Sequence, residues 1–120
     1  MAPTFDHASS LGRELLDEKR VRLLKENRVE SYVRKGHGGI YWRTTDRKGA
    51  NPLELVESAV RLPSYREYFR PALSKLRTVA LPDIQATLNG IPASLISDCG
   101  KEFAKVMLDV AYSSLTGLLK

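Results

Sequence analysis

The stretch Arg28–Gly49, RVESYVRKGHGGIYWRTTDRKG, decides which fold the sequence predicts. Side chains alternate along its first arm, with Val29, Ser31 and Val33 on one side, and they alternate again between Ile40 and Thr45. β-Branched and aromatic residues dominate both arms, as is typical of pleated strands. Two such arms joined by a glycine-rich turn predict an antiparallel β-hairpin.

The turn of this hairpin, Lys35–Gly39, carries three glycines and His37, residue types that occur in phosphate-binding loops and in catalytic sites. Its spacing matches neither a phosphate-binding P-loop nor a dinucleotide-binding turn, which both require a following helix. A catalytic histidine needs an orienting partner and a pocket, and the sequence indicates neither for His37. The glycines are therefore interpreted as residues that permit a positive φ in the turn. The residues expected to face the core are Val29, Val33, Ile40 and Trp42.

Helical patterns surround the hairpin. Apolar spacing and the charge order predict a helix across residues 10–26. Asn51 followed by Pro52 predicts the start of another helix, because asparagine is a good N-cap and proline suits the first helical position. We further expect a capping box at Ser64–Glu67 and a kink or break at Pro71. A short helix is predicted to begin at residues 81–83 and to end at residues 89–90.

The last predicted helix, residues 93–118, is the most apolar element. Its stripe is wide enough to pack into the core of the same chain or to form a seam with a partner. A seam would make a symmetric homodimer the expected assembly. The partner-interface candidates are Phe103, Met107, Val110, Leu115 and Leu118.

These elements predict an α+β fold: an N-terminal helix, a two-stranded antiparallel β-hairpin and a mainly helical C-terminal part. The 120 residues suit one domain, and 42% hydrophobic with 28% charged residues is a globular composition. We expect a flexible terminus at residues 1–8 and a single domain over 9–120, with a basic helix-hairpin part at 9–50 and a helical part at 51–120.

Several classes of protein are disfavoured by composition. The single cysteine excludes an internal disulfide. One cysteine and two histidines are also too few to supply the four Cys and His ligands of a structural zinc site. The sequence indicates no secretory signal and no span of about 20 apolar residues. We therefore expect no metal, no cofactor, no membrane contact and a cytoplasmic location (nuclear if the source is eukaryotic). No catalytic constellation is evident, so an enzyme is not expected.

The positive charge of the chain is concentrated in one segment. Ten cations and three carboxylates lie between Lys19 and Lys48, which gives +7, whereas the whole chain carries +5. Such a segment, interleaved with aromatic residues, predicts contacts with the phosphates of DNA or RNA. Two alternatives remain open: a solvated face without a ligand, and an acidic protein surface bound by an adaptor, inhibitor or accessory subunit. The nucleic-acid-binding candidates are Lys19, Arg20, Arg22, Arg34, Lys35, His37, Arg43, Arg47 and Lys48.

Overall fold

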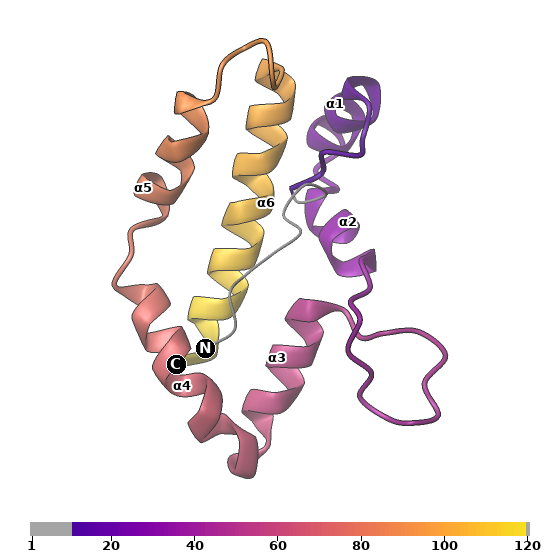
Figure 1. Cartoon of the computed structure of the whole chain (residues 1–120), viewed down its shortest axis with the longest axis vertical. Coiled ribbons are helices and arrows are strands. Elements are labelled where there is room, and N and C mark those ends of the chain that lie inside the picture. The colour runs from indigo at the N-terminus through magenta and orange to yellow at the C-terminus, as the bar shows by residue number, and fades with distance from the viewer. Residues whose placement is uncertain (1–10, 120) are drawn as a thin grey trace.

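Helix α6 (Asp98–Thr116) runs through the middle of the molecule, and the other helices lie around it (Figure 1). The structure is a computed structural model that describes residues 11–119. The expected flexible terminus at residues 1–8 lies outside this range. The other elements, in chain order, are α1 (Asp17–Lys25), α2 (Val29–Lys35), α3 (Pro52–Arg61), α4 (Pro63–Arg77), α5 (Leu81–Ala86), and the 3₁₀ turns η1 (Thr87–Gly90) and η2 (Gly117–Leu119).

The predicted α+β fold with a β-hairpin is wrong: the protein is all-helical, and no strand occurs among residues 11–119. The first arm of the expected hairpin forms α2 instead. Val29, Tyr32 and Val33 also match the i, i+3, i+4 spacing of a helix, which short apolar segments cannot distinguish from a strand. Packing decides the outcome, because this spacing places all three side chains against the core. The second arm is an irregular loop.

The core forms where α1 and α2 meet α6. Phe103 is fully buried and clusters with Leu23 and Val29. The rings of Phe103 and Tyr32 pack edge to face, with their centroids 5.5 Å apart. The expectation that Ile40 and Trp42 face the core is wrong, because both are exposed on the loop. Val29 and Val33 do pack inward.

Several helix ends differ from the expected positions. α1 begins at Asp17, after the extended N-cap residue Leu16. The predicted start near residue 10 is wrong, because Leu11 and Gly12 adopt positive φ values of 56° and 76°, which no right-handed helix accommodates. No capping box forms at Ser64–Glu67, since the N-cap of α4 is Leu62, two residues before Ser64, and Pro63 is the first helical residue. α4 also continues past Pro71 without a break. The N-cap at Asn51 is confirmed.

Candidate functional site: the loop between helices α2 and α3

The α2–α3 loop, residues 36–50, leaves the helical body and returns to nearly the same point (Figure 1). At its base the N–H of Gly38 donates to the carbonyl of Ala50 (2.8 Å), and the N–H of Ala50 donates to the carbonyl of Ile40 (2.7 Å). Gly49 is buried here, and a Cβ at this position would lie 1.8 Å from the Gly38 oxygen. The loop is therefore an Ω-loop whose base closes only because glycine lets two backbones approach.

Asn51 fixes the base of this loop to both neighbouring helices. Its side-chain oxygen accepts from the N–H groups of Leu53 and Glu54, which caps α3. Its amide nitrogen donates to the carbonyls of Val33 and Gly36, each at 2.8 Å, at the end of α2. The residue is 4% exposed, and its buried amide has a partner for each donor and acceptor. One side chain thus joins the end of α2 to the start of α3.

The closed loop presents cations and aromatic rings together. Arg43, Arg47 and Lys48 are exposed, and none of them forms an ion pair within residues 11–119. The one carboxylate of the loop, Asp46, accepts the backbone N–H of Arg43 at 2.8 Å and so shapes the turn. Tyr41 is also exposed, and it lies two residues before Arg43. The loop therefore carries three cations and one carboxylate beside apolar and aromatic side chains.

A groove separates this loop from helices α3 and α4. One wall is formed by Ile40, Tyr41 and Trp42, and the volume is about 580 Å³, within the range of small-molecule sites. Trp42 contacts Tyr65 edge to face, with ring centroids 6.4 Å apart and planes inclined by 73°. The residues that line this aromatic groove are Ile40, Tyr41, Trp42, Leu55, Ala59, Leu62, Tyr65 and Phe69.

Two of the predicted nucleic-acid-binding cations are used inside the protein. Arg20 donates to Asp17 and to the carbonyls of Gly12 and Arg13, and its side chain is largely covered. Arg34 pairs with Glu57 of α3 at 2.8 Å.

The Arg34 guanidinium joins three helices. Besides Glu57 it reaches Ser114 of α6 at 3.3 Å and lies 3.9 Å from Glu30 on its own helix. The hydrogen bond to Glu57 raises the pKa of Arg34 above its ordinary value. Such a residue holds α2 against α3 and α6, which leaves it little freedom to contact a ligand.

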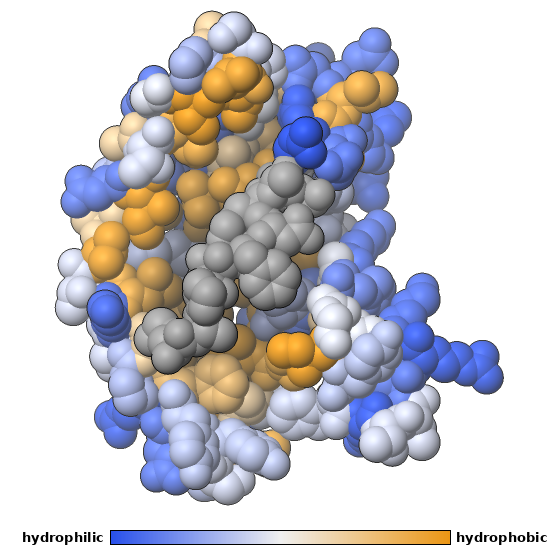
Figure 2. All heavy atoms as spheres, in the orientation of Figure 1, coloured by the Kyte–Doolittle hydropathy of each residue, from blue (hydrophilic) through white to orange (hydrophobic). Residues whose placement is uncertain are grey.

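The other predicted cations are available. Lys19 and Arg22 lie exposed on α1, and Lys35 is exposed at the end of α2. His37 approaches the Gly49 carbonyl through Nδ1 at 3.1 Å, a contact that requires the proton on Nδ1 because a carbonyl only accepts. Figure 2 shows hydrophilic side chains gathered along the side of the molecule formed by α1, α2 and the loop. α1 and the loop lie toward the two ends of this side, with α2 between them (Figure 1).

The predicted partner-interface residues lie along α6 and η2. Phe103 is the centre of the core and has no exposed surface. Met107 packs against the same cluster. Val110, Leu115 and Leu118 are each partly buried. Since α1, α2, α3, α4 and α5 all contact α6, the fold covers much of the apolar stripe.

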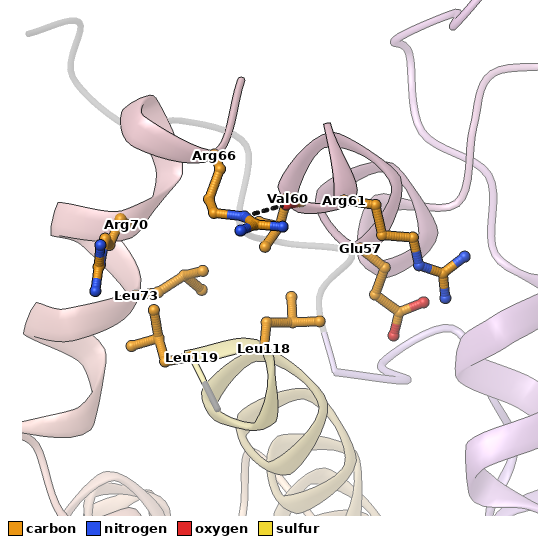
Figure 3. Close-up of a pocket in the computed structure, with 8 residues that line it drawn as sticks. All are labelled: Glu57, Val60, Arg61, Arg66, Arg70, Leu73, Leu118 and Leu119. Carbon is orange, nitrogen blue, oxygen red and sulfur yellow. Dashed lines mark hydrogen bonds between the residues drawn. The ribbon is translucent and has the colours of Figure 1, made fainter. Parts of the chain in front are cut away.

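A second hollow, of about 290 Å³, opens between α3, α4 and the C-terminal turn. Leu73, Leu118 and Leu119 point into it, and Arg66 lies opposite them with its Nε donating to the Val60 carbonyl at 2.8 Å (Figure 3). Arg61 and Arg70 also line this hollow, from α3 and α4. It is therefore a small apolar hollow with an arginine rim.

Sequence reasoning missed the α4 wall of the aromatic groove and the arginine rim of the second hollow. Tyr65 and Phe69 of α4 line the groove on the side opposite the loop. Their position opposite Trp42 depends on how α4 folds back on α3, and no local pattern in the sequence indicates that contact.

Residues 11–119 contain no group of three or more His, Cys, Asp or Glu side chains able to hold a metal ion. Burial raises the pKa of the Cys99 thiol, which disfavours the reactive thiolate. Within the same residues no helix has the length and hydropathy needed to cross a membrane.

Comparisons of the chain with models of protein families, with curated proteins and with solved structures find no match. Any functional conclusion therefore has to come from the residues and their arrangement.

Proposed function

We propose that this protein is a non-catalytic binding protein that contacts nucleic acid, with the α2–α3 loop as its main contact surface. The observation that carries the proposal is the closed loop itself, which presents Arg43, Arg47 and Lys48 beside exposed aromatic rings. Cations bind phosphates with release of counterions, and exposed rings can stack on bases. Helix α1, which lies on the same side of the molecule as the loop (Figure 1), adds the exposed cations Lys19 and Arg22.

The geometry of the loop base supports this proposal. Holding charged and aromatic side chains in solvent on a rigid loop is a common arrangement for binding residues. Asn51, the two backbone hydrogen bonds and the close approach of Gly49 to Gly38 limit the movement of the base. Asn51 is buried and forms all of its hydrogen bonds, and it fixes the base of a loop that contributes little to the core. This favours a binding role for the α2–α3 loop over that of a mere connection.

The alternative ligand is an acidic protein surface, which the same cations would attract. The exposed rings beside the cations favour nucleic acid, because a nucleic acid offers phosphates to the cations and bases to the rings. Competition separates the two: an unlabelled oligonucleotide should displace labelled DNA, whereas polyglutamate of equal charge should displace it poorly. Equal displacement would favour the protein partner.

The proposal is tested by fluorescence anisotropy with a labelled 12-nucleotide oligothymidylate over a series of salt concentrations. Non-specific binding of this kind has Kd values of about 10⁻⁴–10⁻⁶ M near physiological salt. Three phosphate contacts from the loop predict that log affinity falls with log salt at a slope of about 2, at ~0.7 per contact. Absence of binding even at low salt would overturn the proposal.

A matched pair of variants localises the contact. Arg47→Gln/Lys48→Gln removes two charges from the loop, and it should reduce the salt slope by about 1.4. Lys75→Gln/Arg77→Gln removes the same charge from the last turn of α4, away from the loop, and should leave the slope unchanged. Equal losses in the two double variants would show that net charge alone attracts the ligand, which contradicts a specific role for the loop.

A further inference from the structure

The aromatic groove offers flat, solvent-accessible ring surface beside the loop cations. Trp42 is 43% exposed and Tyr65 is 50% exposed, although they contact each other. An edge-to-face pair covers the face of at most one of its rings, so ring faces remain free for a planar ligand. Leu55, Ala59 and Leu62 also line the groove, and their apolar side chains offer no hydrogen bond.

The chain places positive charge next to this groove. Arg43 directly follows Trp42, and Arg47 and Lys48 lie in the same loop. Arg61 of α3 and Arg66 and Arg70 of α4, by contrast, line the other hollow. Residues 57, 60 and 61 face that hollow while 55, 59 and 62 face the groove, as the helical rotation of about 100° per residue requires. The cations available to a ligand in the groove are therefore mainly those of the loop.

We propose that the groove between Trp42 and Tyr65 accepts an unpaired base, so the ligand of the loop is single-stranded nucleic acid. This inference rests on the proposed function and specifies its ligand. The loop cations would bind the phosphates that flank the inserted base. A base within a duplex cannot enter the groove, because neighbouring base pairs stack on both of its faces.

A membrane surface is the other ligand that binds aromatic and basic loops together. The geometry of the groove favours single-stranded nucleic acid over a membrane surface. Trp42 turns toward Tyr65 and lines a hollow, whereas insertion into lipid requires rings that project from the tip of a loop. Anionic vesicles therefore serve as a second arm of the experiment.

The experiment uses Trp42 as its own probe, since it is the only tryptophan of the chain. The full-length protein is titrated with 12-nucleotide oligothymidylate, with a 12-base-pair duplex and with vesicles containing phosphatidylserine. Stacking of a base should quench the fluorescence of Trp42 with the single strand, and the duplex and vesicles should leave it nearly unchanged.

Substitutions then separate stacking from charge. Trp42→Ala should weaken single-strand binding by a factor of about 5 to 150, the range for one lost base stack, without changing the salt slope. Trp42→Phe should restore most of the affinity. Tyr68→Ala is the matched control, because Tyr68 is an exposed aromatic residue of α4 that does not line the groove, and it should bind as the wild type does.

The outcomes test the base-binding groove separately from the proposed binding of nucleic acid by the loop. Equal binding of strand and duplex, with Trp42 fluorescence unchanged, would overturn the base-binding groove and leave nucleic-acid binding intact. Failure of both nucleic acids to bind would overturn the proposed function itself. If vesicles quench the fluorescence of Trp42 and the oligonucleotide does not, the ligand of the groove is a membrane surface and not single-stranded nucleic acid. Circular dichroism checks that each variant is folded, and the wild-type titration decides the question even if one is not.

Discussion

At the scale of single residues, the loop depends on side chains and glycines that carry no charge. Asn51 uses both of its N–H donors and accepts two hydrogen bonds, so its amide is fully satisfied although buried. Gly49 contributes by its lack of a side chain. Neither residue is a candidate ligand contact, yet both determine whether Arg43 and Trp42 are held in place.

Replacement of Asn51 should separate its two functions. Asn51→Ala loses the cap and both tethers, and we expect the free energy of unfolding to fall by about 2–4 kcal/mol. Asn51→Asp keeps the cap acceptor but places a carboxylate against two carbonyls, so it should also be clearly destabilised. Urea denaturation measures both. An Asn51→Asp variant as stable as the wild type would refute the tether to Val33 and Gly36.

Two glycines of the loop form a matched test. A Cβ on Gly49 meets the Gly38 oxygen, whereas a Cβ on Gly39 has no atom within 4 Å. Gly49→Ala should therefore open the base of the loop and increase its cleavage by trypsin, which cuts after Arg47 and Lys48. Gly39→Ala should be neutral or stabilise by ~0.4–1 kcal/mol, by restricting the unfolded chain. Equal protease sensitivity in the two variants would show that the base is not closed.

At the scale of elements, the N-cap of α3 could be predicted from sequence because Asn51-Pro52 is a local signal with a local cause. α2 could not, because Val29–Lys35 satisfies both strand and helix periodicity. Its helical form follows from the packing of Val29 and Tyr32 on Phe103, which is distant in sequence. The loop cations were recognised from charge, but the groove beside them requires α4, whose position is likewise a tertiary property.

Pro71 lies in the interior of α4, where it cannot donate a backbone hydrogen bond to Glu67. The position is exposed, and the helix continues through it. Pro71→Ala should therefore supply the missing bond and increase the free energy of unfolding by about 1–3 kcal/mol. Chemical denaturation would detect this gain. Loss of stability would mean instead that a bend at Pro71 is needed for α4 to pack against α3.

Asp17 links α1 to the start of α6. Ser97 donates to its carboxylate at 2.9 Å, and this bond, with a second from Arg20, lowers the pKa of Asp17 below its ordinary value. A lowered folded-state pKa adds stability that is present above the unfolded pKa and is lost as pH falls through the folded pKa. Asp17→Asn should therefore be less stable than the wild type at pH 7, and the difference should shrink at low pH. A difference independent of pH would contradict this contact.

At the scale of the whole molecule, the fold separates structural from exposed cations. Arg20 and Arg34 are used to hold α1, α2 and α3 in place, whereas the loop cations are not paired within the described residues. α6 supplies the centre on which the helices pack, with Phe103 fully buried. The loop cations, with Lys19, Arg22 and Lys35, are thus the part of the basic side that the structure leaves available to a ligand.

The most direct test of the proposed function is to map the contact on the protein. Uniformly ¹⁵N-labelled protein is titrated with unlabelled 12-nucleotide oligothymidylate, and amide and indole chemical shifts are followed by NMR. We expect the largest changes in residues 38–50, in the Trp42 indole and in residues 62–69 across the groove. Chemical-shift changes confined to the start of α6, which lies far from the loop (Figure 1), would contradict the assignment of this loop as the binding surface. The absence of any changes at a ligand excess would contradict it as well.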